Sequence, residues 1–409
     1  MTEICDIKSC TGCAACAGVC AHKAISMVEV PPHGYLHPKI NNDLCVDCGL
    51  CSKTCPVNNP PVFNSPLTAF AAISKDRDDL MSSSSGAASS VLATHIVNKG
   101  GVVYGSVEED YAHIAHQRID SLTDLPKIKG SKYVHSYTTD IFPKVKADLQ
   151  QGLEVLFLGT PCQIAGLRKY LRKSYDNLTL VDLCCHGVPS QKFLRDDVEH
   201  LCDVTFRNKG DMSKPWDRWG LYVTFRNKGD MSKPWDRYGI YLSGKEKNMI
   251  ISPFLKDNYI TAFMSGLLFR ENCYTCPYAR AERVSDITIA DFWGYQGKQI
   301  KSDDGISLLM PSTEKGMQLI ESCQSAFYCE ERLAAEATKS NGQFNHPSSR
   351  PEERDAFLLM YPEDMQQAYR IALRNYRKNY KRLILKIKIY KVLKPLAKLK
   401  RKVIKNKRL

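Results

Sequence analysis

The sequence predicts an α+β protein in three parts: a small cysteine-rich N-terminal module, a larger α/β domain and a basic helical tail. Two matching runs of four cysteines stand within the first sixty residues. After them, apolar segments of strand length alternate with helical segments and glycine-containing loops, a pattern typical of α/β domains. At the other end, residues 370–409 contain 17 Lys and Arg and no Asp or Glu.

The cysteine runs predict two [4Fe–4S] clusters in a ferredoxin-type domain over residues 1–60. Each run has the spacing C-x2-C-x2-C-x3-C. Three thiolates in one tight turn can face a single cubane, whereas the fourth cysteine of each run ligates the other cluster. Zinc or disulfides are the alternatives, and eight cysteines in two identical spacings argue against both. The expected ligand sets are Cys10, Cys13, Cys16 and Cys55 for one cluster, and Cys45, Cys48, Cys51 and Cys20 for the other.

The composition fits a cytoplasmic protein of two or three domains. The 409 residues are 43% hydrophobic and 25% charged, which is ordinary for a globular chain. Seventeen cysteines indicate a reducing compartment in which thiolates bind metals. We find no secretory signal and no apolar run of about 18 residues, so neither export nor a membrane span is expected. The formal net charge of +13 comes from the tail, and residues 1–369 are mildly acidic.

A proline-rich stretch, residues 56–66, predicts a linker between the module and the next domain. Beyond it, residues 67–74 predict a buried strand, residues 82–86 a serine-rich loop ending in glycine, and residues 87–98 a helix. Another strand starts at Val102, so the order is βαβ-like. A helix N-terminus preceded by hydroxyls and glycine can bind a cofactor phosphate, and an ordinary capped turn is an equal alternative.

Cysteines also follow two predicted strands in the middle of the chain. Residues 155–158 lead to Cys162, and residues 178–183 lead to Cys184 and Cys185. Ligands bind at the carboxyl ends of strands in open α/β sheets, so cysteines at this edge suggest a site. Taken singly, each one is more often a buried thiol.

The pair Cys273 and Cys276, spaced C-x-x-C, supplies further thiols. With Cys162 and one of the cysteines after residues 178–183 it makes four thiolates, enough for a third cluster. From spacing alone, zinc or inert packing stays about as plausible as iron–sulfur.

Residues 204–218 recur letter for letter at 223–237. Two copies are too few for a solenoid, which needs at least three units. We therefore expect a duplicated strand and turn that extends a surface hairpin by one strand. Since two identical copies cannot both occupy one unique site, neither copy is assigned a catalytic role.

The tail, residues 350–409, predicts a basic amphipathic helix interrupted at Pro395. Such a helix favours an anionic membrane surface. A solvated extension is the main alternative, and a nucleic acid or protein partner is the weakest one. The apolar positions recur every three or four residues: Leu385, Ile389, Val392, Leu396, Leu399 and Val403.

Several motifs occur together in the α/β part of the chain. They are Gly130-Ser131-Lys132-Tyr133, Gly159-Thr160-Pro161-Cys162-Gln163, Cys185-His186-Gly187-Val188-Pro189-Ser190, and Cys273-x-x-Cys276 with Asp286-Ile287. In this order they resemble the coenzyme F420 hydrogenase/dehydrogenase beta subunit family, and more closely its bacterial members with a fused N-terminal 2[4Fe–4S] ferredoxin domain. The resemblance covers roughly residues 1–345 and leaves the tail unexplained.

This resemblance implies a flavoprotein with an iron–sulfur cluster beside the flavin. Residues 67–150 would form the flavin-binding N-terminal part of the domain, and residues 151–345 its C-terminal part, with the inner cluster and the duplicated hairpin. Two positions depart from the family pattern, because Ala87 and Ala290 stand where glycine is usual. The flavin would lie against Ser84, Ser85, Gly86, Ser131, Lys132 and Tyr133.

The same resemblance implies the ligands of the inner cluster. Cys185 is preferred over Cys184 because it directly precedes His186-Gly187. The inner ligands are then Cys162, Cys185, Cys273 and Cys276. The thiols left over are expected to be ordinary ones: Cys5, Cys184, Cys202, Cys323 and Cys329.

The expected function is an FAD- and iron–sulfur-dependent oxidoreductase. It would pass electrons from a ferredoxin-like donor through the clusters to FAD and a reducible organic substrate. The alternative is a non-catalytic electron-transfer subunit that serves a partner enzyme. The catalytic proton donor is assigned to His186 by position, ahead of His95, His113, His116 and His135. Expected partners are the donor or a redox partner subunit, with the tail at the inner face of the cell membrane and no nucleic acid.

Overall fold

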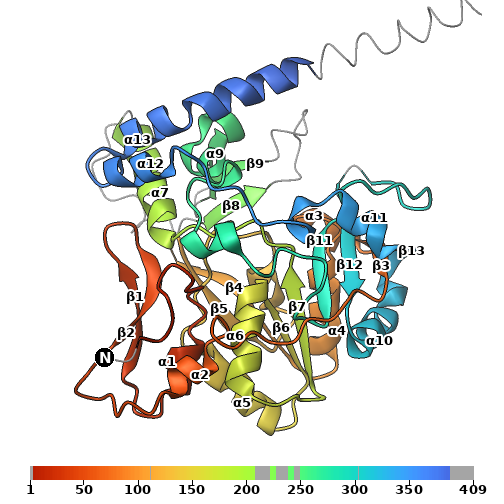
Figure 1. Ribbon diagram of the computed structural model, residues 1–409. Helices are drawn as coiled ribbons and strands as arrows, with labels where there is room; N and C mark the ends of the chain where they lie inside the picture. The colour runs from red at the N-terminus through yellow and green to blue at the C-terminus, as the bar shows by residue number, and fades with distance from the viewer. Residues whose placement is uncertain are drawn as a thin grey trace, which may run out of the picture. The chain divides into compact units, whose positions relative to one another are not determined.

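The computed structural model describes residues 3–110, 112–207, 222–226, 238–243, 249–302 and 304–386 (Figure 1). The chain divides into two compact units, Met1–Arg350 and Pro351–Leu409. The first unit contains the cysteine-rich module and the α/β domain together.

The N-terminal module consists of a hairpin and two short helices. Strands β1 (Ile25–Val30) and β2 (Tyr35–Ile40) pair antiparallel, and helices α1 (Ala15–Val19) and α2 (Leu50–Thr54) each lie within one cysteine run. Both helices begin after a residue in the left-handed conformation, Ala14 with φ 62° and Gly49 with φ 68°. The two runs therefore fold alike, as their identical spacing predicts.

An eight-stranded mixed sheet forms the centre of the α/β domain. Its strand order is β13-β3-β12-β11-β7-β6-β4-β5. The neighbours β4, β6, β7 and β11 are parallel, and β12, β13 and β5 pair antiparallel to their neighbours. The strands are β3 (Ala69–Ser74), β4 (Val102–Asp110), β5 (His113–Ile119), β6 (Val155–Gly159), β7 (Leu178–Leu183), β11 (Ile287–Asp291), β12 (Ser307–Pro311) and β13 (Phe327–Arg332).

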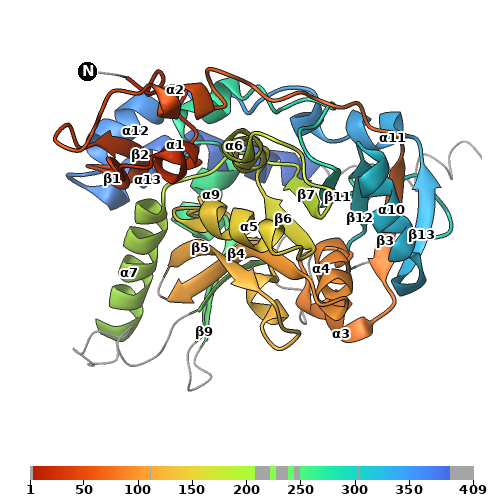
Figure 2. The ribbon, with the colours of Figure 1, turned by 90° about the horizontal axis from the view of Figure 1, so that it is seen from below.

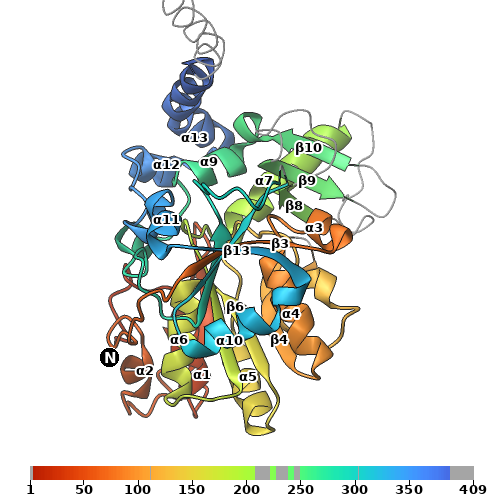
Figure 3. The ribbon, with the colours of Figure 1, turned by 90° about the vertical axis from the view of Figure 1, so that its right-hand side faces the viewer.

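Helices cover both faces of this sheet, because its strands present apolar residues to both sides. Val103 and Leu156 pack with α4 (Ala88–Asn98) and α10 (Glu314–Ser322). Their neighbours Tyr104 and Phe157 point to the opposite core, formed with α5 (Ile141–Gln150) and α6 (Pro161–Leu171). Figure 3 shows α4 and α6 on opposite sides of β6.

The N-terminal module packs on the α6 side of the sheet. Cys13 and Ala15 belong to the same apolar core as Ile164 and Leu167 of α6. Figure 2 shows α1 and α2 alongside α6. A small N-terminal iron–sulfur domain followed by an α/β domain is thus the architecture predicted from the sequence.

Shorter elements complete the first unit. A separate three-stranded sheet has the order β10-β9-β8. Its strands are β8 (Tyr222–Arg226), β9 (Tyr238–Ser243) and β10 (Met249–Pro253). The remaining helices are α3 (Arg77–Ser82), α7 (Gln191–Arg207), α9 (Asn258–Met264) and α11 (Ala334–Lys339), with 3-10 turns η1 (Leu125–Ile128), η3 (Phe254–Lys256), η4 (Glu271–Thr275), η5 (Gln324–Ala326) and η6 (Gly342–Phe344).

The predicted βαβ-like order is found, since β3, α3, α4 and β4 follow one another along the chain, with β12, β11, β7 and β6 between the two strands in the sheet. Two predicted boundaries need correction. The predicted helix at 87–98 starts at Ala88, and Ala87 caps it in the left-handed conformation. The predicted strand at 67–74 starts at Ala69.

The duplicated segment does not supply the same element twice. In the first copy, residues 204–207 (Val-Thr-Phe-Arg) end helix α7, whereas the same four residues at 223–226 lie in strand β8. The prediction of one strand per copy is therefore wrong for the first copy. The reason is tertiary, because β8 is set by pairing with β9 and 204–207 continue a helix begun at Gln191. Residues 208–218 and 227–237 lie outside the described residues.

The second unit is helical as far as the structure describes it. It contains α12 (Arg354–Met360), α13 (Met365–Ala372) and a helical stretch over 374–386. The rings of Phe357, Tyr361 and Tyr369 pack together between α12 and α13. The recurring apolar positions of the tail after Leu385, together with Pro395, lie outside the described residues. None of the helices in the described ranges has the length and apolarity to cross a bilayer.

Replacement of Ala87 by glycine is expected to stabilise the protein by up to about 1 kcal/mol. An alanine in the left-handed conformation costs about 1–2 kcal/mol, and glycine removes this cost. Glycine also gives the unfolded chain more conformational entropy, which offsets part of the gain in stability. Urea denaturation of Ala87→Gly measures the change. The control is Ala88→Gly in the first turn of α4, which should destabilise by about 1 kcal/mol. Equal losses in the two variants would contradict the assignment of strain to residue 87.

Candidate iron–sulfur sites and cofactor cavity

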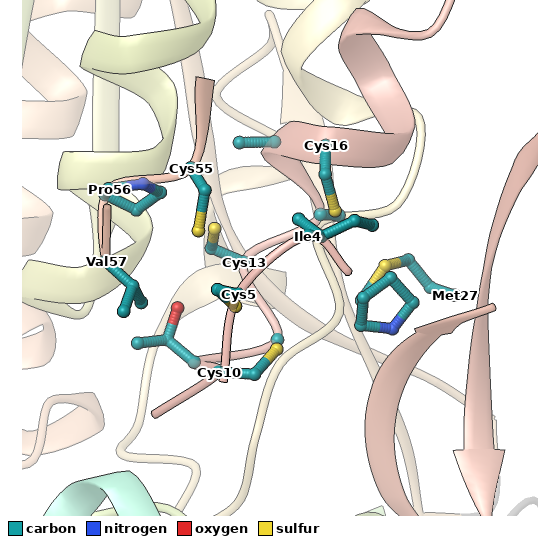
Figure 4. A pocket seen from close by; sticks show the side chains of 14 residues that line it. Ile4, Cys5, Cys10, Cys13, Cys16, Met27, Cys55, Pro56 and Val57 are labelled. Atoms are coloured by element: carbon teal, nitrogen blue, oxygen red, sulfur yellow. The ribbon is translucent and has the colours of Figure 1, made fainter. Parts of the chain in front are cut away.

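The first thiol set lines one cavity in the N-terminal module. The cavity is walled by Ile4, Met27 and Val57, and sulfur atoms point into it from both cysteine runs (Figure 4). Its cysteines include Cys10, Cys13, Cys16 and Cys55. The structure therefore brings together the set that crossed ligation predicts, with Cys55 coming from the second run. Their burial suits a cluster held away from water.

The second thiol set lies at the surface of the module. Burial raises the pKa of Cys51, and the neighbouring Cys48 and Cys45 thiols raise it further. Cys20 packs against the same apolar cluster as Cys51. Cys48 is exposed, as is Val46 at 59%. This set thus faces solvent, whereas the first set is buried.

Cys5, which is expected to be an ordinary thiol, also lines the first cavity. Its thiol hydrogen bonds with Cys10 and Cys55, which raises the pKa of Cys5. The same bond from Cys5 lowers the pKa of Cys10 to about 4. Cys5 stands outside the repeated spacing, so the sequence carries no signal for it. Cys202 lies among residues whose side chains the structure does not describe.

The four predicted inner ligands come from three places in the fold. Cys162 is the second residue of α6, whose N-cap Thr160 contacts its sulfur at 3.2 Å. Cys185 follows β7, which is the parallel neighbour of β6. Turn η4 carries Cys273, and Cys276 follows directly.

These four thiols converge in a buried region. Burial raises the pKa of Cys185 well above its usual range, and the thiols of Cys273, Cys162 and Cys276 raise it further. Burial likewise raises the pKa of Cys273 to about 12, with Cys162 and Cys276 adding to the shift. Four thiolates would need a compensating cation in such a region.

The thiol of Cys184 has other neighbours than the thiol of Cys185. Burial raises the pKa of Cys184 to about 12, and its charged neighbours are Arg283, Asp182 and Asp291 rather than the other thiols. The two adjacent cysteines therefore have different neighbours.

Within the described parts of the chain, no group of three or more His, Cys, Asp or Glu side chains is placed to hold one metal ion.

The first set and the inner set lie beside the same face of α6. Gly166 lies one turn after Cys162, and a Cβ at Gly166 would be 2.8 Å from the sulfur of Cys13. Tyr278 is near thiols of both sets. Burial raises the pKa of Tyr278, and thiols of both sets raise it further: Cys162, Cys13, Cys276 and Cys55. Sequence reasoning missed both residues. A glycine inside a helix was the available signal for Gly166, because it weakens the helix unless packing requires it.

A cavity of about 360 Å³ opens on the other side of the inner thiols. This volume lies in the range of small-molecule sites. It is lined by the serine loop before α4, the 130–133 loop and the ends of β6 and β7. Predicted residues in its wall are Ser84, Ser85, Ser131, Lys132, Tyr133, Cys185 and His186.

Gly86 is absent from the residues that line this cavity. A Cβ at Gly86 would be 2.2 Å from Ala72 O and 2.6 Å from Ser307 N. Its close approach to β3 and β12 explains the glycine. The structure therefore gives Gly86 a packing role.

The two predicted flavin loops are joined to each other. Ser131 N donates to Ser84 Oγ at 2.7 Å. Lys132 Nζ donates to the carbonyls of Lys129 at 2.7 Å and Lys127 at 3.1 Å. Burial lowers the pKa of Lys132 to about 8. The Tyr133 ring stacks on Phe263 with centroids 4.8 Å apart.

Two of the five candidate histidines line the cavity, His116 and His186. His116 is held by Leu158 O at 2.8 Å and Ser136 Oγ at 2.9 Å, so both ring nitrogens are occupied. Burial lowers the pKa of His116 to about 4, which makes it neutral at pH 7. Burial also lowers the pKa of His186, and its hydrogen bond with Gln343 raises it by a smaller amount. The structure places His95, His113 and His135 outside the cavity wall.

Two thiol sets in a ferredoxin-like module, beside an α/β domain, define an iron–sulfur electron-transfer protein. Residues 9–59 match the 4Fe-4S dicluster domain model. Residues 152–337 match the model of the C-terminal region of the beta subunit of coenzyme F420 hydrogenase/dehydrogenase. Residues 152–337 are thus related to this beta subunit, and the predicted resemblance is confirmed.

Two known proteins show the extent of similarity. An uncharacterized polyferredoxin-like protein of Methanocaldococcus jannaschii is 44% identical over 62 residues, which are 13% of this chain and 36% of that protein. The chain thus matches about a third of that relative's length. A chain of the xenon-derivatised F420-reducing [NiFe] hydrogenase complex from Methanosarcina barkeri is 19% identical with a TM-score of 0.45, over 65% of this chain and 82% of that one.

His116 should make stability depend on pH. Its folded pKa of about 4 lies below the ordinary value of 6.5, so the unfolded chain binds the extra proton and stability falls as pH drops through 6.5. Between pH 7.5 and 5.5 this loss is about 1 kcal/mol. We expect His116→Gln to be less stable at pH 7. Its free energy of unfolding, measured by chemical denaturation, should lack this loss between pH 7.5 and 5.5. An unchanged slope would contradict the buried neutral ring.

Proposed function

We propose that the protein is an iron–sulfur flavoprotein oxidoreductase. Electrons enter from a ferredoxin-like donor, cross three [4Fe–4S] clusters and reach FAD and a reducible organic substrate in the cavity. The observation that carries the proposal is the shared wall: Cys185 belongs to the inner thiol set and also lines the cavity. A cofactor bound there would lie directly against an inner cluster ligand.

The order of the clusters follows from their exposure. The set with Cys48 is at the surface, where a donor protein can approach. The set with Cys13 is buried between it and the inner set, and Gly166 allows the close approach to Cys162. In this proposal the ligand sets are those predicted from the sequence: Cys20, Cys45, Cys48 and Cys51 outermost, then Cys10, Cys13, Cys16 and Cys55, then Cys162, Cys185, Cys273 and Cys276.

The cavity wall suits FAD. When bound, a flavin supplies the conversion of single electrons into a hydride equivalent. The hydroxyls of Ser84 and Ser85 precede the N-terminus of α4, a favourable place for a phosphate. Lys132 uses two of its three N–H groups on carbonyls, which leaves one donor for an anion. The stacked Tyr133 and Phe263 rings provide a flat apolar wall.

We assign the proton donor for the substrate to His186. It lines the cavity next to Cys185, and at pH 7 its neutral ring carries one N–H, which its hydrogen bond with Gln343 orients. Lys132, with its pKa lowered to about 8 by burial, can resupply protons near neutral pH. His116 is excluded from this role because both its nitrogens are held.

A second candidate function is an electron-transfer subunit that delivers electrons to a partner enzyme. The family description as a beta subunit favours it, since a beta subunit works within an assembly. In this case the same clusters serve a redox partner subunit, and the substrate is reduced on the partner.

We also propose that the protein works in the cytoplasm with its tail on the inner face of the membrane. Exposed apolar residues accompany the basic ones in the second unit: Ile371 is 52%, Leu383 51% and Leu385 59% exposed. Basic side chains next to exposed apolar ones favour an anionic lipid surface.

Metal and flavin analysis of the anaerobically purified protein tests the first proposal. We expect about 12 irons and one flavin per chain, three four-iron clusters in all. Cys185→Ser should lose about four irons, because a ligand of the inner cluster is removed. The matched control Cys184→Ser should keep all of them. About eight irons without flavin in the unmodified protein would refute the inner site.

Turnover separates the two candidate functions. Reduction of a candidate substrate by the purified protein with dithionite-reduced ferredoxin supports the enzyme. Turnover only after a second polypeptide is added supports the electron-transfer subunit.

Liposome co-sedimentation tests the tail. A chain ending at Leu373, which keeps the packed α12–α13 pair, should stay in the supernatant with anionic vesicles, whereas the full chain should pellet. Neutral vesicles serve as the control. Equal pelleting of both forms would rule out the membrane role.

A further inference from the structure

Arg270 is a buried cation with no carboxylate partner. It is 2% exposed. Its Nη2 donates to the carbonyl of Cys10 at 2.9 Å and its Nε to Asn272 Oδ1 at 3.4 Å. Its Nη1 is buried without a hydrogen-bond partner, and no ion pair joins it to an acidic residue in the described part of the chain. An unpaired buried charge is costly, and arginine cannot lose its proton to avoid the cost. Arg283 differs from Arg270, because its charge is already paired with Asp182 at 3.0 Å.

Arg270 links the two buried thiol sets. Its carbonyl accepts from Cys273 N at 3.0 Å, at the start of the turn that carries the inner ligands. Its side chain reaches across to the loop of the first set, where it lies beside Gly12. Arg270 thus contacts a ligand of each set, Cys10 through its guanidinium and Cys273 through its backbone carbonyl.

We propose that Arg270 is the shared counter-cation of the two buried clusters, a positioning residue that raises the reduction potentials of both. The part that concerns the inner cluster rests on the proposed function. Each one-electron reduction adds a negative charge to a cluster, and an adjacent guanidinium stabilises the reduced form. The outer cluster faces solvent, where water screens such a charge. Arg270 therefore makes the buried clusters better electron acceptors than they would be without it.

Redox titration of the full chain, followed by electron paramagnetic resonance, tests this assignment. In Arg270→Gln we expect two of the three couples to become harder to reduce. A tenfold lower ratio of reduced to oxidised cluster corresponds to about 59 mV for one electron. The third couple should not move. Arg270→Lys should recover most of the shift, because it keeps the charge. Arg350→Gln is the matched control. Arg350 Nε donates to Glu271 Oε1 at 2.8 Å, and Glu271 is the first residue of η4, so this arginine is paired with a carboxylate.

The outcomes distinguish the inference from the proposed function. Twelve irons with unchanged potentials in Arg270→Gln would overturn the inference and leave the function intact. Equal shifts in the Gln and Lys variants would mean that geometry rather than charge matters, which also overturns it. About eight irons in the unmodified protein would remove the inner cluster and, with it, the shared role. If the Gln variant loses iron, retention by the Lys variant supports the charge role, and equal loss in both contradicts it.

Discussion

The contact between the Cys13 sulfur and Gly166 sets how closely the N-terminal module approaches the α/β domain. A side chain at position 166 would collide with that sulfur at 2.8 Å. Because Cys162 lies one turn earlier on the same helix, this contact also decides the separation of the first and inner thiol sets. A relay of one-electron carriers depends on such short separations. The rest of the site is arranged around this junction.

The strand order of the sheet accounts for the inner site. Parallel pairing of β6 with β7 brings the residues after both strands to one edge, so Cys162 and Cys185 meet. The cysteine pair of η4 arrives from a separate turn and is held there through the carbonyl of Arg270. On the far side of Cys185 the same edge opens into the cavity. The inner thiols and the cavity therefore lie at the same edge of the sheet, and Cys185 belongs to both.

Charge is distributed unevenly around these sites. Surface cations such as Arg350 and Lys129 are paired with carboxylates. Arg270 is buried without a carboxylate partner in the described part of the chain. Lys132 donates to two carbonyls, and the charge of Glu108 also acts on it. In the proposed function, Arg270 compensates reduced clusters and Lys132 a cofactor phosphate.

The sequence by itself determined the local features of this protein. Cysteine spacing predicts the two clusters, because three of the four expected ligands of each lie within a few residues of one another. Apolar runs and the motifs after them located the inner cysteines and both cavity loops. Tertiary structure alone decided the roles of Cys5, Tyr278 and Arg270, the packing role of Gly86 and the two conformations of Val-Thr-Phe-Arg. These depend on contacts between distant segments, such as Arg270 with Cys10, which no local pattern encodes.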